Sequence, residues 1–178
     1  EDGEGRLYLR VVDYKTGEKT FDIRNVRHGL DMQMLLYLFS LWENGARRYG
    51  REVLPAGVLY SGVKPPQVDL KIGGDVGGEN VEIRTSGLFL KNEEILRAME
   101  PALEGVFIPV KAGDLAKEKS SLIGLDAFTE LKREVTQTVL RYADELRRGA
   151  ACARPLVVNG KSPCEYCKMR PVCRTGSK

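Results

Sequence analysis

An aspartate and a lysine two positions apart, Asp13 and Lys15, form the first pair of residues whose types and spacing could do chemistry. They follow an apolar run, residues 7–12, which we predict to be a β-strand. Because alternate strand side chains share a face, the two charges should lie side by side. The carboxylate can hold a hard divalent cation, while the ammonium orients water or stabilises charge on a phosphate, as metal-assisted hydrolysis requires. Taken alone, the spacing is more typical of a surface ion pair beside a turn.

A second polar pair, Gln33 and Tyr37, lies on a helix that we predict from about residue 30 to residue 48. Their spacing of four places them one turn apart on a single face. A buried Gln33 would need hydrogen-bond partners for both ends of its amide. The simpler interpretation is a partly exposed glutamine on an amphipathic helix.

Three cysteines cluster near the C-terminus with the spacing Cys164-x2-Cys167-x5-Cys173, and Cys152 precedes them. The chain shows no secretory signal, so this clustering favours a metal over disulfides. Tetrahedral thiolate sites suit zinc or an iron–sulfur cluster. The fourth ligand is either Cys152 or a cysteine outside this chain. The alternative is that the three cysteines are unrelated and buried.

The length and composition are those of a globular protein: 178 residues, 42% hydrophobic and 30% charged. We predict one domain, residues 1–150, followed by a cysteine-rich appendage, residues 151–178. The net charge of +3 is compatible with nucleic acid without being diagnostic. No apolar run approaches the roughly 18 residues of a membrane helix, so we expect no membrane contact and a cytoplasmic location.

The elements that must position these residues alternate between strands and helices, which indicates an α/β fold. Further strands are predicted at residues 54–63, 68–72, 81–84 and 106–111, with a flexible glycine-rich connection at 73–78. Residues 20–27 are predicted to be irregular. Helices are predicted after a cap at Asn92 and over residues 125–148, where Gly149 suits a C-terminal cap. The single histidine, His28, is expected to have a structural or surface role.

The first six residues read as a polar hairpin turn whose first strand is absent. We therefore expect the chain to be an excised fragment, with its sheet truncated at the N-terminal edge.

Together these features resemble the PD-(D/E)xK nucleases of the RecB type. Within them, the resemblance is to the C-terminal nuclease domains of AddB-type (RexB-related) subunits of ATP-dependent helicase/deoxyribonucleases. The segments that carry it occur in the right order: Val11-Val12-Asp13-Tyr14-Lys15-Thr16-Gly17, Gly29-Leu30-Asp31-Met32-Gln33-Met34-Leu35-Leu36-Tyr37-Leu38, Pro55-Ala56-Gly57-Val58-Leu59-Tyr60 and the cysteine tail. The resemblance covers nearly the whole chain.

The resemblance implies a restriction-endonuclease-like mixed sheet flanked by helices, with its active site at the end of the first strand. By that resemblance, Asp13 and the backbone carbonyl of Tyr14 bind Mg²⁺, and Lys15 is the catalytic lysine. Gln33 and Tyr37 help to position the site and the DNA.

For the tail, the resemblance implies that Cys164, Cys167 and Cys173 bind a [4Fe–4S] cluster. The fourth cysteine of the family lies upstream of the nuclease motifs, so Cys152 is expected to be structural or free. The family's first metal-binding aspartate is also missing here, and Asp2, in the turn, is a poor substitute. We therefore expect this chain alone to cleave DNA negligibly and to hold no stable cluster.

The implied activity is that of an exonuclease that degrades the 5′→3′ strand during double-strand-break repair and recombination. Its partner would be an AddA-type helicase/nuclease subunit in a heterodimer. The basic residues Lys161, Lys168, Arg170 and Arg174 would contact the DNA backbone or form a solvated face. The competing interpretations are a non-catalytic, metal-stabilised DNA-binding module and a stand-alone RecB-like nuclease.

Overall fold

The structure is a computed structural model that describes residues 2–17, 19–63, 83–150, 152–158, 160 and 162–173. Two predicted features, the strand at residues 68–72 and the glycine-rich connection at 73–78, lie outside the described residues.

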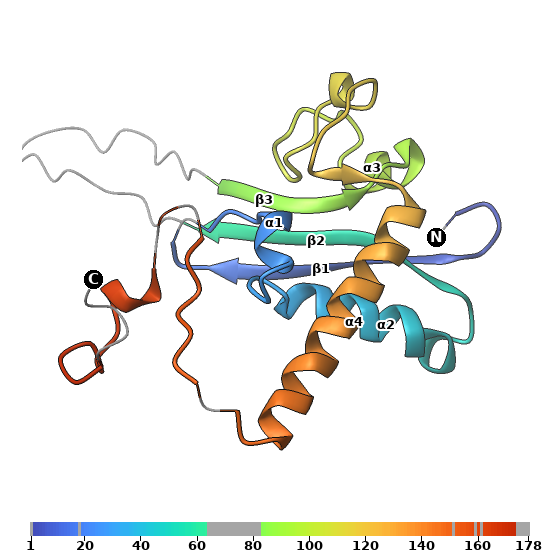
Figure 1. The fold of residues 1–178 in the computed structure, drawn as a ribbon. Helices are drawn as coiled ribbons and strands as arrows, with labels where there is room; N and C mark the ends of the chain where they lie inside the picture. Colours follow the sequence, from blue (N-terminus) through green and yellow to red (C-terminus); the bar gives the residue numbers. More distant parts are fainter. Residues whose placement is uncertain are drawn as a thin grey trace, which may run out of the picture.

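A mixed four-stranded sheet forms the centre of the fold (Figure 1). Its strands, in spatial as well as chain order, are β1 (Leu7–Lys15), β2 (Val53–Val63), β3 (Ile83–Leu90) and β4 (Leu122–Ile123). β1 and β2 run parallel, β2 and β3 antiparallel, and β3 and β4 parallel. The predicted α/β architecture, a mixed sheet flanked by helices, is confirmed.

Two long helices cover one face of the sheet, α2 (Gln33–Tyr49) and α4 (Leu125–Arg147) (Figure 1). The hydrophobic cluster on this face joins the helices to Val58 and Tyr60 of β2; its helical members are Met34, Leu35, Leu38, Phe39, Phe128, Leu131 and Val135. A short helix, α1 (Ile23–Val26), lies within the stretch predicted to be irregular. Burial of this cluster is what holds the helices on the sheet.

Helix ends follow their local sequence signals. α2 ends at Gly50, whose φ of +68° is a left-handed conformation that glycine adopts at little cost. Gly149, after α4, has a φ of +69°. The Asn92 side chain accepts the N–H of Ile95 at 3.2 Å and caps α3 (Glu93–Met99) as predicted. The long helices α2 and α4 were therefore predictable to within a few residues at each end, whereas the short helix α1 was not.

The opposite face of the sheet carries α3, the 3₁₀ turn η1 (Ala112–Asp114) and the loop between them (Figure 1). The predicted strand at residues 106–111 is wrong, because these residues make only an isolated bridge between Glu104 and Lys111. Instead, the carboxylate of Glu100, only 3% exposed, accepts backbone N–H groups from residues 104–108 at 2.9–3.0 Å. A loop whose N–H groups converge on one carboxylate cannot offer them to a sheet.

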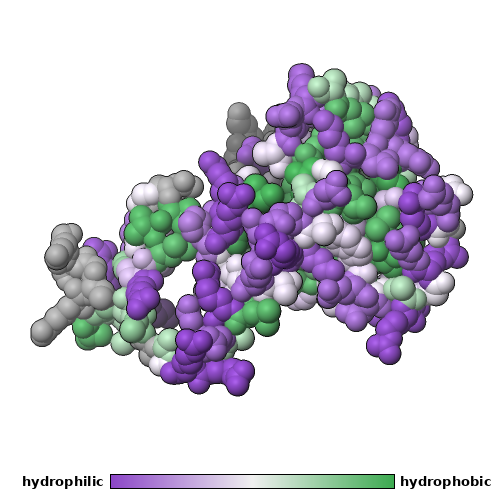
Figure 2. All heavy atoms as spheres, turned by 45° about the vertical axis from the view of Figure 1, so that its right-hand side comes forward, coloured by the Kyte–Doolittle hydropathy of each residue, from purple (hydrophilic) through white to green (hydrophobic). Residues whose placement is uncertain are grey.

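The strand predicted at residues 81–84 is longer than expected. β3 extends from Ile83 to Leu90, and Leu88 and Phe89 are fully buried in it. The surface seen in Figure 2 is largely hydrophilic, with hydrophobic residues exposed in scattered patches. None of the described helices is both long and apolar enough to cross a bilayer.

Candidate active site

Asp13 and Lys15 lie side by side at the carboxyl end of β1. The Lys15 ammonium is 2.8 Å from Oδ2 of Asp13, and the two side chains are 34% and 25% exposed for Lys15 and Asp13, respectively. Val11, two residues earlier, packs against the cluster beneath α2 and α4, whereas Val12 packs against the opposite cluster. The expected shared face is therefore observed, and it is the face that carries α2.

The strand register extends this face across the sheet. Asp13 is paired with Tyr60 on β2, and Tyr60 with Ser86 on β3. In the next row, Lys15 is paired with Gly62 and Gly62 with Arg84. Side chains of directly paired residues project from the same face of a sheet. The Lys15 ammonium accordingly lies 5.7 Å from the centre of the Tyr60 ring.

The segment after β1 turns back across this end of the sheet. A Cβ added at Gly62 would lie 3.2 Å from the carbonyl oxygen of Gly17, so the missing side chain leaves room for the crossing. The segment is fastened to β3 where the Phe21 N–H donates to the Ser86 hydroxyl at 2.9 Å. This crossing carries residues 19–21 into the neighbourhood of the Asp13–Lys15 pair.

Lys19 is held by two groups at once. Its ammonium is 2.8 Å from Oδ1 of Asp31 and 4.9 Å from the centre of the Tyr60 ring. The hydrogen bond to Asp31 raises the pKa of Lys19. Asp31 is 12% exposed, has a φ of +56° and also accepts from the Asn25 amide at 3.0 Å. A non-glycine residue in this conformation is uncommon and is kept there by its surroundings.

Gln33 is the first residue of α2, two positions after Asp31. Its Nε2 donates to the Tyr37 hydroxyl at 3.3 Å, and both side chains are exposed, as the simpler interpretation of this pair expected. No hydrogen bond or ion pair joins either of them to Asp13 or Lys15 among the residues that the structure describes. The ion pair between Lys19 and Asp31 links the segment after β1 to the residues just before α2.

Two other predicted residues lie away from the pair. The Tyr14 side chain projects from the opposite face of β1 and is exposed, so only its backbone carbonyl can serve the site. Asp2 forms a turn with Arg6 before β1 begins. About 20 Å of strand separates Leu7 from Asp13, which excludes Asp2 as a ligand beside Asp13.

Asp13 suits a hard divalent cation as one oxygen ligand. It meets Lys15 through Oδ2, and within the described part of the chain its Oδ1 makes no hydrogen bond or ion pair. Magnesium usually takes one or two carboxylates and fills its other positions with water and substrate phosphate. No three His, Cys, Asp or Glu side chains among the described residues gather into a closed metal site.

The cysteine tail packs beside the start of α2. An apolar cavity of about 420 Å³ lies between Asn25 and Leu30 on one side and the tail on the other, where Leu156, Val158, Ser162, Pro163 and Tyr166 line it. Cys164 lies in the 3₁₀ turn η2 (Pro163–Glu165). Neither Cys152 nor any cysteine of the cluster forms a disulfide. The described tail does not bring Cys164, Cys167 and Cys173 together around a common point.

The basic residues proposed for the tail are only partly described. Lys168 and Arg170 are exposed, whereas Lys161 and Arg174 lie outside the described residues. His28 is exposed, and its backbone carbonyl accepts the Tyr142 hydroxyl at 3.2 Å, as a structural or surface histidine would.

Sequence reasoning missed Lys19, Asp31, Tyr60 and Ser86. Their contacts depend on the register of three strands and on the crossing over Gly62, which no local pattern encodes. The available signal for Asp31 was its place two residues before Gln33, at the start of a predicted helix where acidic residues are favoured.

Comparisons with known proteins identify the family of the chain. Residues 1–174 match the sequence profile described as the PD-(D/E)XK nuclease superfamily. The chain is 34% identical over 185 residues to the B-type subunit of the ATP-dependent helicase/deoxyribonuclease of Acetivibrio thermocellus. It is 32% identical over 187 residues to the corresponding protein of Clostridium perfringens. Each alignment covers 98% of this chain and 16% of the relative, so the chain spans about a sixth of the length of these relatives.

Proposed function

Because the chain belongs to the PD-(D/E)XK nuclease superfamily, we propose that the end of β1 is the active centre of a deoxyribonuclease. The observation that carries this proposal is the Asp13–Lys15 pair, 2.8 Å apart, solvent-accessible and on the same sheet face as Tyr60. A carboxylate that is only partly engaged and an adjacent ammonium are two of the groups that metal-assisted phosphodiester hydrolysis uses.

In this proposal Asp13 and the backbone carbonyl of Tyr14 hold Mg²⁺. When bound, the ion would act as a Lewis acid that polarises the phosphate and lowers the pKa of a bound water molecule. The Lys15 ammonium places positive charge where the transition state gains negative charge. Gln33 and Tyr37, hydrogen-bonded to each other at the start of α2, position the substrate strand at the site.

We further propose that the chain acts within a helicase/deoxyribonuclease, as the names of its relatives suggest. The substrate is then DNA. The chain acts as an exonuclease that degrades the 5′→3′ strand in double-strand-break repair and recombination. The partner is an AddA-type helicase/nuclease subunit. The alignment over 98% of the chain supports this assignment.

For the tail we propose that Cys164, Cys167 and Cys173 supply three thiolates to a [4Fe–4S] cluster. Their spacing supports this, although the three residues do not converge in the structure as it stands. Iron and sulfide analysis of full-length protein purified without oxygen, with a visible absorbance spectrum, tests the assignment. Loss of iron in Cys167→Ala but not in Cys152→Ala is expected; stoichiometric zinc in place of iron would overturn it.

The decisive test of the nuclease is Asp13→Ala in the full-length protein with its partner subunit. Cleavage of the strand assigned to this chain, the one degraded 5′→3′ and end-labelled for the assay, should fall to background while ATP-dependent unwinding persists. Glu93→Ala is the matched control, because Glu93 is also a carboxylate with an ion pair to a nearby cation, Arg97, but lies on α3.

Two outcomes would contradict the proposal. Unchanged cleavage in Asp13→Ala would place the active centre elsewhere, as a non-catalytic DNA-binding module requires. Loss of cleavage together with unwinding and thermal stability would mean that Asp13 is structural.

A further inference from the structure

A polar groove lies along β3, between the segment that crosses the catalytic face and the loop of residues 104–109 on the opposite face. It begins at Lys19, beside the Tyr60 ring, and reaches Arg84, in the same cross-strand row as Lys15. The cavity measures about 410 Å³ and is lined by Lys19, Thr20, Arg84, Thr85, Ser86, Gly105 and Pro109. None of these described lining residues is acidic. The groove therefore presents cationic and hydroxyl donors on a surface that starts at the proposed active centre.

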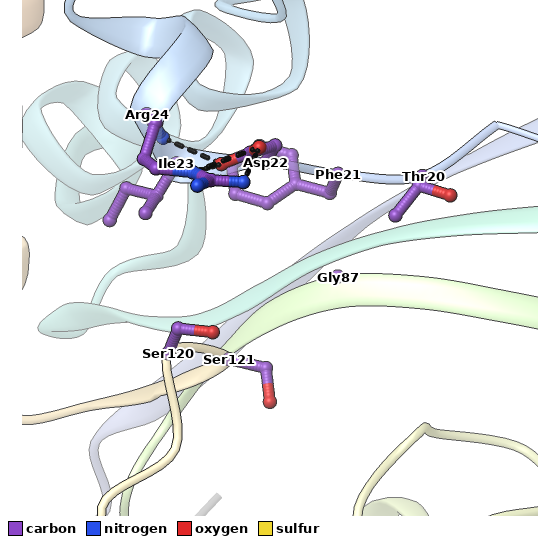
Figure 3. A pocket seen from close by; sticks show the side chains of 8 residues that line it. All are labelled: Thr20, Phe21, Asp22, Ile23, Arg24, Gly87, Ser120 and Ser121. Carbon is purple, nitrogen blue, oxygen red and sulfur yellow. Dashed lines mark hydrogen bonds and ion pairs between the residues drawn. The ribbon is translucent and has the colours of Figure 1, made fainter. Parts of the chain in front are cut away.

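Thr20 joins this groove to a second cavity of about 440 Å³. Figure 3 shows its wall at Asp22 and Arg24, which pair through several hydrogen bonds, and the facing loop at Ser120 and Ser121. Gly87 lies on the strand between the two walls (Figure 3). The two cavities therefore adjoin at Thr20, and the second is lined by hydroxyl groups, by the Asp22–Arg24 pair and by the apolar side chains of Phe21 and Ile23.

The groove is built from fixed parts. The Lys19 ammonium is held by Asp31 and by the Tyr60 ring, and Thr20 is followed by the Phe21–Ser86 hydrogen bond. Lys19 remains partly exposed, and an ammonium has three donors, so its bond to Asp31 leaves others for a ligand. A cation fixed before its ligand arrives loses little side-chain entropy on binding.

The far wall of the groove is the loop organised by Glu100. Gly105 and Pro109 line the groove, and Phe107 lies between them in sequence with 62% of its surface exposed. The backbone of the loop is held by Glu100, and Ile108 is fully buried beneath it. Single-stranded nucleic-acid sites combine cations with exposed aromatic rings that stack on bases, and Phe107 supplies such a ring on the loop that lines this groove.

We propose that this groove binds one DNA strand beside the phosphate that is cleaved. Lys19 and the hydroxyl-lined floor contact the sugar–phosphate backbone, and Phe107 stacks against one base. The assignment rests on the proposed nuclease function. It adds a strand-binding subsite, independent of base sequence, on the β3 side of the Asp13–Lys15 pair.

The test compares Phe107→Ala with wild type in the full-length protein and its partner, using labelled oligothymidine as substrate. The KM for cleavage should rise about tenfold, with a much smaller change in kcat, because a lost stack weakens binding of the strand. Phe107→Trp should restore KM. A series of substrates should then carry one abasic nucleotide each, at successive positions. At one position the missing base should weaken binding to wild type but not to Phe107→Ala, because the variant has already lost the stacking contact.

Lys19→Met tests the backbone contact. The slope of log(kcat/KM) against log(salt) should become shallower by about 0.7, as expected for one phosphate contact on a single strand. Arg47→Met, at the far end of α2, is the matched control and should keep the wild-type slope. Lys19→Arg should retain the contact, and melting temperatures show whether Lys19→Met is folded.

The outcomes separate this proposal from the nuclease assignment. The proposed strand-binding groove is overturned if Phe107→Ala keeps the wild-type KM and abasic profile and Lys19→Met keeps the wild-type salt slope. In that case Asp13→Ala should still abolish cleavage, so the nuclease assignment stands. If Asp13→Ala leaves cleavage intact, the nuclease assignment itself fails. If Lys19→Met unfolds, the abasic profile of Phe107→Ala decides, since Phe107 is exposed and its truncation removes no core packing.

Discussion

Two carboxylates on this chain show opposite uses of the same chemical group. Glu100 is buried, and its two oxygens accept five backbone N–H groups, from residues 104–108. Asp13 is partly exposed and, within the described residues, meets one side chain, the ammonium of Lys15. A carboxylate offers about four lone-pair positions. Glu100 has none left for a ligand, whereas Asp13 does.

The difference separates a carboxylate whose bonding capacity is fully used within the fold from one that can still accept a ligand. Burial alone would raise the pKa of Glu100, but the N–H groups donated by its loop outweigh burial and lower it. The lowered pKa of Glu100 therefore reflects a structural role. A carboxylate beside a cation that still has free lone pairs is a better candidate for binding a ligand.

The largest effect that would sharpen this contrast is on activity. Lys15→Met should lower the rate of DNA cleavage by about 10²–10³-fold, the usual cost of removing one group that stabilises transition-state charge. The free energy of unfolding should change by less than about 1 kcal/mol, because the pair is partly open to solvent, where an ion pair contributes little. Single-turnover cleavage and urea denaturation measure the two quantities. A large loss of stability would show that the pair is structural after all.

The converse change, Glu100→Gln, should act on stability. It turns one acceptor oxygen into an amide donor that faces backbone N–H groups, and a buried group left unsatisfied costs about 1–3 kcal/mol. We expect a loss of about 2–4 kcal/mol in urea denaturation, since more than one donor loses its partner. Glu93→Gln, on the exposed side of α3, is the control and should change stability by less than about 1 kcal/mol.

Acid should distinguish the carboxylates as well. Because the folded pKa of Glu100 lies below its ordinary value of 4.5, its contribution to stability is present above that pH and is lost as pH falls through the folded pKa. The free energy of unfolding of wild type minus that of Glu100→Gln should therefore shrink as pH falls below about 4.5. Denaturation curves at a series of pH values measure this difference. A difference independent of pH would mean that the Glu100 carboxylate is not what holds the loop.

The smallest expected effect is at the crossing near Asp13. Gly62→Ala places a methyl group 3.2 Å from the Gly17 carbonyl and 3.3 Å from that of Arg84, closer than ordinary contact. We expect a cost of about 1 kcal/mol, at the low end for overpacking, because the segment after β1 can shift. Cleavage should fall by less than about tenfold, since that cost corresponds to less than one decade in rate. A fall in the cleavage rate as large as that of Lys15→Met would show that the segment crossing Gly62 cannot shift and is as rigid as the Glu100 loop.

Sequence alone predicted the features that depend on nearby residues. The Asn92 cap, the end of α4 just before Gly149 and the shared face of Asp13 and Lys15 all follow from spacings of a few positions. Prediction from sequence failed at residues 106–111. Their apolar composition suggested a strand, but the Glu100 carboxylate, outside the segment, accepts the backbone N–H groups of residues 106–108.

The candidate site was predictable in the same partial way. Its central pair is local in sequence, whereas Tyr60 and Ser86 join it only through strand pairing. Ser86 bonds to a residue 65 positions away, and no periodicity reports such a contact. The roles of Gln33 and Tyr37 and of the three clustered cysteines rest on the family resemblance and stay predictions.

The Glu100 loop also bears on how freely this chain can vary. The path of residues 104–108 is set by their N–H groups, which every amino acid except proline provides. A saturation mutagenesis of the loop should therefore accept most residues at 104 and 106, while Gly105, with a φ of +85°, and buried Ile108 resist change. Because the Glu100 carboxylate sets the backbone path, residues 104 and 106 can vary in sequence while the loop keeps its shape.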